Sequence, residues 1–249
     1  MSPPVLYVFA ISHYCEKARW ALDSLGLEYA LRHLAPGSHM QVTQQLGAAG
    51  SSLPLLVSAK RVVQGSGAIL DWAESAVAGS PGRLSPAPEL ADECRALERR
   101  LDDVAGVHVR RYYYSEAILE HPGSVRPIFA RDLPPSERRS LDESWDLVCR
   151  LMVGSMDLGP EQREESRRIV EAELDWFDGL LRDGRRFLVG DRFSRADLTA
   201  ASLLAPLALP PEHPTYAALE LPPRTRADLA RWAERPTLAW VREIYREHR

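Results

Sequence analysis

Short apolar runs alternate with helical patterns over the N-terminal third of the chain. The first run, Val5 to Ile11, predicts a strand, and a polar turn from Ser12 to Tyr14 separates it from a helical pattern that begins at Cys15. Further strands are predicted around 28–31, 53–57 and 61–64, a helix at 68–74, and a weaker helix near 41–46. The order βαβ(α)ββα predicts a mixed sheet with helices packed on it.

The remainder of the chain shows no convincing strand. Its apolar positions recur at helical spacing and predict helices over 89–105, 107–119, 136–157, 160–183, 198–209 and 226–247, whereas the proline-punctuated region 121–135 is assigned no element. Residues 79–88 are rich in Pro, Gly and Ser, which is typical of a linker. We therefore predict an α/β domain at 1–78, a linker at 79–88 and an all-α domain at 89–249.

The apolar run at 198–209 has a recognisable helix start in front of it. Ser194 stands three residues before Asp197, so the serine hydroxyl can accept from the Asp197 N–H while the carboxylate reaches back to the Ser194 N–H. This pattern is a capping box with Asp in place of the usual Glu. Asp197 is therefore predicted to be structural.

Composition narrows the class of protein. The 249 residues are 45% hydrophobic and 27% charged, as in a soluble globular protein, and no apolar run is long enough for a membrane span. No secretory signal is visible, and a net charge of −4 gives no reason to expect nucleic acid or membrane as a partner. Three scattered cysteines argue against a disulfide framework and predict a cytoplasmic protein. No His, Cys, Asp or Glu grouping has zinc spacing, so no metal is predicted.

Two strand-to-helix turns carry the candidate chemistry. A helix N-terminus has free N–H groups and a positive dipole end, so it favours an anion. Ser12 stands at the first such turn, where its hydroxyl can cap the helix or face a ligand. Ser66 stands at the second, within the turn Gly65-Ser66-Gly67. These turns predict a site for a negatively charged ligand.

Taken together, the motifs resemble a known family. The N-terminal pattern with Ser12-x-x-Cys15, Leu53-Pro54 and Ser66-x-Ala68-Ile69 looks like the thioredoxin-like domain of a soluble glutathione transferase, of a serine-type, bacterial-like class. The helical remainder, with 187–191 before the Ser194-x-x-Asp197 box, resembles the second domain of the same family. The resemblance covers nearly the whole chain and implies an enzyme that transfers glutathione to a small hydrophobic electrophile.

The resemblance implies a role for each site residue. Ser12 matches the hydroxyl that hydrogen-bonds the glutathione sulfur, and Ser66 matches the serine that holds the γ-glutamyl carboxylate. Pro54 matches the cis-proline, and the backbone of Leu53 would pair with the peptide part of glutathione. The residue before the second serine is usually acidic or Gln but is Gly65 here, and the adjacent Gln64 is a candidate replacement.

Other interpretations of the same residues remain open. Cys15 could be a redox nucleophile of a glutathione-dependent thiol reductase, although Ser12 occupies the attacking position and Cys15 the usually buried one. Tyr7 could be an activating hydroxyl, but its place inside the first strand favours a core role. His13 could line the ligand site or act as a base, although a partly exposed turn residue is favoured. A transferase fold that binds a ligand or partner without catalysis is a further alternative. It is motivated by Gly65 and by the loop before Pro54, which lacks basic or bulky polar residues.

Two expectations concern the helical part and assembly. Tyr112, Tyr113 and Tyr114 lie about 100° apart on one helix, so one or two could line a co-substrate pocket while another is core or surface. The family resemblance implies a homodimer, paired around Arg83–Leu84 and the helix at 89–105.

Overall fold

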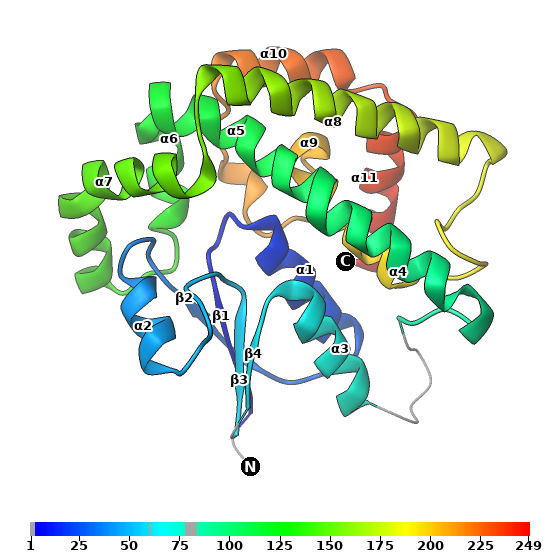
Figure 1. Cartoon of the computed structure of the whole chain (residues 1–249), viewed down its shortest axis with the longest axis horizontal. Helices are drawn as coiled ribbons and strands as arrows, with labels where there is room; N and C mark the ends of the chain where they lie inside the picture. Colours follow the sequence, from blue (N-terminus) through cyan, green and yellow to red (C-terminus); the bar gives the residue numbers. More distant parts are fainter. Residues whose placement is uncertain (1–2, 60, 78–83) are drawn as a thin grey trace. The chain divides into compact units, whose positions relative to one another are not determined.

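The computed structural model describes residues 3–59, 61–77 and 84–249, which form two compact units (Figure 1). The first unit comprises Met1–Leu84 and Arg126–Val148, and the second comprises Ser85–Val125 and Cys149–Arg249. The predicted domains at 1–78 and 89–249 stay a prediction, and most of the predicted linker lies outside the described residues. The sequence pattern does not anticipate that residues 126–148 pack with the N-terminal unit.

The first unit is built on a four-stranded mixed sheet, as predicted. Its strands are β1 (Val5–Val8), β2 (Ala30–His33), β3 (Leu55–Ser58) and β4 (Arg61–Gln64). They lie in the order β2-β1-β3-β4, with β1 parallel to β2 and antiparallel to β3, and with β4 antiparallel to β3. The fold is therefore a thioredoxin-like sheet followed by an all-helical part.

Alternation along β1 assigns its side chains to two faces of the sheet. Leu6 and Val8 are fully buried on the face covered by α1 (His13–Ser24) and α3 (Ser66–Ala76), which lie side by side (Figure 1). Tyr7 belongs to the opposite face, where the cluster of Tyr7, Leu34 and Leu55 packs against apolar residues of α2 (His39–Gln45). Both faces are covered, which explains why β1 is a nearly continuous apolar run in the sequence.

The start of α1 corrects the prediction for residues 9–14. β1 ends at Val8, the Ser12 N–H donates to the Phe9 carbonyl at 3.2 Å, and the helix begins at His13 rather than Cys15. The polar residues that predict a turn, Ser12 to Tyr14, are the N-cap and the first residues of the helix, where polar side chains are common. His13 is only 5% exposed, so the interpretation as a partly exposed turn residue is wrong.

The rest of the chain is helical, as predicted. The α-helices are α4 (Ala91–Arg100), α5 (Gly106–Glu120), α6 (Pro122–Phe129), α7 (Pro135–Met156), α8 (Pro160–Leu180), α9 (Arg195–Ala208), α10 (Pro223–Trp232) and α11 (Pro236–His248). A π-helical segment, Leu101–Ala105, joins α4 to α5. The region 121–135 does contain a helix, α6, which begins at a proline because the first helical position needs no N–H. No helix of the described residues is long and apolar enough to cross a membrane.

The capping box at α9 is confirmed. The fully buried Asp197 carboxylate accepts from the Ser194 N–H at 2.8 Å, from the Ser194 hydroxyl at 2.8 Å and from the Leu188 N–H at 2.7 Å. Burial raises the pKa of Asp197 to about 6, while these donors act in the opposite direction. The contact with Leu188 ties the preceding turn to the helix, so Asp197 is structural.

A buried ionic cluster joins α5, α8 and α10 in the second unit. The Arg163 side chain is 7% exposed, and its Nη2 lies 3.1 Å from both the Glu116 and the Asp228 carboxylates. Its guanidinium carbon lies 4.7 Å from the centre of the Tyr112 ring, and the Tyr112 hydroxyl donates to Asp228 at 2.8 Å. One arginine thus contacts two carboxylates from two different helices.

Glu116 also caps α10. Its carboxylate accepts from the Arg224 N–H, the Thr225 N–H and the Thr225 hydroxyl, each at 2.8 Å. Burial alone would raise the pKa of the Glu116 carboxyl, but these donors and Arg163 together hold that pKa below its usual value. The carboxylate is therefore charged at neutral pH and satisfies N–H groups that the start of α10 leaves open.

Candidate functional site

The sheet brings the three predicted ligand-binding stretches to one of its ends. Tyr7 of β1 pairs with Leu55 of β3, and Leu55 pairs with Gln64 of β4. The antiparallel register therefore places the end of β1, the start of β3 and the end of β4 together. The Gly65 N–H donates to the Pro54 carbonyl at 3.0 Å across this end. The stretches that contain Ser12, Pro54 and Ser66 leave the sheet at the same place.

Two helices begin at this end of the sheet. Ser12 is the N-cap of α1, and Ser66 is the first residue of α3 and is 6% exposed. Gly65 caps α3 with φ of +93°, a conformation that favours glycine. The positive ends of two helix dipoles thus follow strands that end together, an arrangement that favours negatively charged groups.

Ser12 can serve both roles that the sequence leaves open. Its Oγ accepts a hydrogen bond from the Cys15 N–H at 3.3 Å, which is a helix cap. A hydroxyl accepts through a lone pair and keeps its own proton to donate elsewhere. Capping therefore does not exclude donation to a ligand sulfur.

The backbone around Pro54 has the predicted form. The Leu53–Pro54 peptide bond is cis, as the sequence analysis predicts for Pro54. The Leu53 side chain packs against the apolar clusters on both faces of the sheet. Pairing of the Leu53 backbone with a peptide ligand stays a prediction.

Gln64 has a structural contact that the sequence analysis missed. Its Oε1 accepts from the Gly50 N–H at 3.0 Å, and its Nε2 donates to the Gly50 and Ser52 carbonyls at 2.8 Å. The carboxamide thus holds the loop that leads to Pro54. Contact between Gln64 and a ligand stays a prediction.

His13 and Tyr7 occupy different elements, since His13 begins α1 and Tyr7 lies within β1. His13 follows Ser12 directly, and its ring centre is 4.6 Å from that of Tyr14. Tyr7 is 7% exposed and belongs to the cluster facing α2, on the sheet face opposite α1 and α3. The core interpretation of Tyr7 agrees with this position.

Cys15 is buried inside the first unit. It is 1% exposed, and burial raises the pKa of its thiol to about 11, although a hydrogen bond with Ser12 and the nearby Arg19 act to lower it. A thiol attacks as the thiolate, so a group this hard to ionise is a poor nucleophile. The packing interpretation is supported against the redox one.

We expect Cys15 to resist alkylation in the native protein. With a pKa of about 11, only about 0.1% of this thiol is ionised at pH 8. Cys94 is equally buried, whereas Cys149 is partly exposed and should react first. Peptide mass spectrometry after iodoacetamide treatment, with and without denaturant, measures this order. Native modification of Cys15 as fast as Cys149 would contradict the buried assignment.

The tyrosine run in α5 lies entirely inside the protein. Tyr112, Tyr113 and Tyr114 are 0%, 9% and 6% exposed, so none is a surface residue. Tyr112 belongs to the ionic cluster, and the rings of Tyr113 and Tyr114 lie 5.3 Å apart. The core role predicted for at least one of them is confirmed, and a co-substrate role for the others stays a prediction. Across residues 3–59, 61–77 and 84–249, no group of three or more His, Cys, Asp or Glu could hold a metal ion.

Comparisons with known proteins agree with this geometry. A family model for the N-terminal domain of glutathione S-transferase matches residues 6–81, and one for the C-terminal domain matches 160–235, so the two span more than half of the chain. The glutathione S-transferase TCHQD of Arabidopsis thaliana is 24% identical over 217 residues, covering 82% of this chain and 77% of the plant protein.

Solved structures share the fold over the full length of the chain. The glutathione transferase GSTFuA3 of Phanerochaete chrysosporium has a TM-score of 0.68 at 19% identity, covering 100% of this chain and 98% of the fungal chain. The glutathione S-transferase CsGST63524 of Ceriporiopsis subvermispora, solved in complex with glutathione, has a TM-score of 0.64 at 15% identity, with 99% and 98% covered. At these identities the likeness concerns the fold.

Proposed function

The chain belongs to the glutathione S-transferase family, and from this premise we propose that it binds glutathione at the end of the sheet and transfers it to a small hydrophobic electrophile. The observation that carries the proposal is that Ser12 and Ser66, each at a helix N-terminus, meet cis-Pro54 at one end of the sheet. The fungal relative solved with glutathione has the same fold. We assign the chain to the serine type because Ser12, not Tyr7, stands at the start of α1.

In this proposal Ser12 stabilises the glutathione thiolate. A free thiol with a pKa of about 8.5 is mostly protonated at neutral pH, and the thiolate is the nucleophile. The Ser12 hydroxyl proton and the N-terminus of α1 both favour the charged form. The sulfur then donates an electron pair to the electrophilic carbon, an S–C bond forms, and the displaced group leaves with its bonding electrons.

The remaining residues position the peptide. Ser66 and the first N–H groups of α3 hold the γ-glutamyl carboxylate, and the Leu53 backbone pairs with the peptide part. Gln64 positions the loop before Pro54 through its bonds to Gly50 and Ser52, and its amide is the candidate partner of the ligand's amino group. His13, the buried first residue of α1 next to Ser12, is a candidate to line the ligand site.

We expect Ser66→Ala to weaken glutathione binding. A hydrogen bond to a charged group contributes roughly 1.5–3 kcal/mol, so the dissociation constant should rise about tenfold or more. The rate at saturating glutathione should change much less, because the thiolate remains beside Ser12. Calorimetry and a KM-against-kcat comparison measure both, with Ser75→Ala on the exposed end of α3 as the control. Equal binding by Ser66→Ala and Ser75→Ala would contradict the assignment.

A non-catalytic protein that binds ligands or partners is the second candidate. Gly65 removes one side chain from the family's glutathione contacts, and the loop before Pro54 carries no basic residue. Calorimetry with glutathione, followed by competition with S-hexylglutathione, separates the two candidates. Heat that S-hexylglutathione abolishes supports the transferase, whereas no heat at millimolar concentrations rejects it. The thiol reductase is disfavoured by the buried Cys15.

We also propose a cytoplasmic homodimer. The family resemblance supports the dimer, and α4 with its flanking residues is the proposed contact region, although Arg83 lies outside the described residues. Three cysteines without a disulfide among them agree with a reducing compartment. Sedimentation at micromolar concentration should give twice the chain mass of 27.9 kDa. A mass near that of one chain would reject the dimer.

A further inference from the structure

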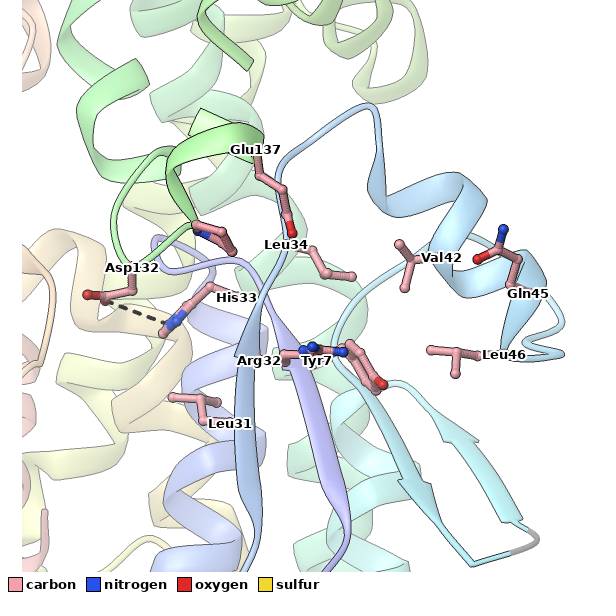
Figure 2. Close-up of a pocket in the computed structure, with 11 residues that line it drawn as sticks. Tyr7, Leu31, Arg32, His33, Leu34, Val42, Gln45, Leu46, Asp132 and Glu137 are labelled. Atoms are coloured by element: carbon pink, nitrogen blue, oxygen red, sulfur yellow. Dashed lines mark ion pairs between the residues drawn. The ribbon is translucent and has the colours of Figure 1, made fainter. Parts of the chain in front are cut away.

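A cavity of about 420 Å³ lies within the first unit, along the outer edge of β2. Its walls come from β1, β2, α2 and the start of α7 (Figure 2). Ser12, Pro54 and Ser66 are not among its lining residues. Its volume falls within the range of small-molecule sites. The cavity is therefore a second candidate binding site, separate from the glutathione site proposed above.

One wall of the cavity is an open strand edge. β2 is the first strand of the sheet and pairs only with β1 among the described strands. The Ala30 and Leu34 N–H groups donate to carbonyls before and at the end of β1, at 2.8 and 3.0 Å. Because N–H directions alternate along a strand, those of Leu31 and His33 point to the outer edge. This edge offers amide donors and acceptors to a ligand.

Two opposite charges face the cavity from different elements. Arg32 extends from β2 beside the ring of Tyr7, and Glu137 descends from α7 toward the strand (Figure 2). Within the described parts of the chain, neither side chain has an ion pair or hydrogen bond. Asp132, by contrast, lies 4.0 Å from His33 and 3.6 Å from Arg131. Arg32 and Glu137 are thus the charges left for a ligand.

Another wall of the cavity is aliphatic. The side chains of Leu34, Val42 and Leu46 form it, on the sheet face that also carries Tyr7, and the polar side chain of Gln45 lines the cavity beside them. A ligand that fills the cavity therefore needs a carboxylate for Arg32, an ammonium for Glu137 and an apolar side chain against this wall. An amide group would in addition match the open edge of β2.

We propose that this cavity binds a small zwitterionic peptide, of dipeptide size, with an apolar side chain. The carboxylate contacts Arg32 and the Tyr7 hydroxyl, the ammonium contacts Glu137, and the peptide group pairs with the edge of β2. The proposal does not depend on the transferase activity.

Glycyl-L-leucine is the probe that tests the proposal. Titration into the native protein, followed by heteronuclear NMR, should shift amide signals at 31–34 and 42–46. N-acetylglycyl-leucine, which lacks the ammonium, and glycyl-leucinamide, which lacks the carboxylate, should each bind at least tenfold more weakly. Equal binding of either analogue would show a site for one charge only and would overturn the zwitterion assignment.

Variants locate the probe in the cavity. Arg32→Gln and Glu137→Gln should each weaken glycyl-leucine binding at least tenfold, whereas the exposed neighbours Arg138→Gln and Glu143→Gln should not. Saturating glutathione and Ser66→Ala should leave the binding unchanged, so failure of one site is distinguishable from failure of the other. No binding at millimolar peptide, displacement by glutathione, or insensitivity to both variants would reject the proposal.

Discussion

Ser12→Ala should lower the rate of glutathione conjugation near pH 6.5 by about ten- to a hundredfold. A hydrogen bond to a charged group contributes roughly 1.5–3 kcal/mol, and one pKa unit corresponds to about 1.36 kcal/mol. Loss of the Ser12 donor should therefore raise the pKa of the bound thiol by about one to two units. Binding of the peptide part of glutathione should stay largely intact, because in the proposed site Ser66 and the Leu53 backbone hold it.

The same variant removes the cap of α1, which costs about 1 kcal/mol of stability. Two further variants separate the cap from the donor. Ser12→Thr keeps both the capping acceptor and the hydroxyl donor, and it should retain most of the conjugation rate. Ser12→Asp keeps a capping acceptor but has no donor, so it should lose most of that rate. If Ser12→Asp conjugates as well as the unmodified protein, the hydroxyl is only a cap.

Arg163→Ala should lower the free energy of unfolding by about 3–5 kcal/mol. This is the usual cost of removing one partner from a buried ion pair. Here two carboxylates, Glu116 and Asp228, would lose the same guanidinium at once. Urea unfolding followed by circular dichroism measures the change.

Arg167→Ala is the matched control, because it lies one turn further along α8. Its side chain is 20% exposed and pairs with Glu164 at 2.7 Å and with Glu171 at 2.8 Å. Each surface ion pair contributes roughly 0–1 kcal/mol, so this change should be smaller. Equal losses of unfolding free energy in the two variants would mean that the cluster around Arg163 stabilises the protein no more than surface ion pairs do.

Local motifs predict most of the fold and identify the candidate site residues. The apolar run at 5–11 and the short apolar runs after it predict a sheet, because strands that are buried on both faces are apolar along their whole length. The capping box at Ser194 and Asp197 is readable because both partners lie within one turn of the same helix. Ser12, Pro54 and Ser66 are identified from short motifs, and the sheet register then explains why they meet.

Contacts between residues that are far apart in the sequence cannot be predicted from local motifs. Arg163 and Glu116 are charged residues within helical patterns, and only the packing of α5 against α8 buries them. Gln64 contacts Gly50 across the sheet end, which no local pattern encodes. His13 is predicted to lie in a turn because helix caps and turns favour the same polar residue types.

The cavity beside β2 likewise cannot be predicted from the sequence. Arg32 and Glu137 are separated by more than a hundred residues, and α6 occupies a proline-rich stretch that carries little helical signal. Their approach follows from the packing of Arg126–Val148 with the N-terminal unit. Sequence spacing alone gives no reason to pair them.

The pKa of glutathione bound to the protein tests the central claim most directly. Thiolate absorbance should be titrated against pH in the unmodified protein, in Ser12→Ala and in Cys15→Ala. We predict a bound-thiol pKa at least about one unit below the free value of about 8.5, a return toward that value in Ser12→Ala, and no change in Cys15→Ala. An unchanged pKa in Ser12→Ala, with activity lost in Cys15→Ala instead, would contradict the account and favour the reductase.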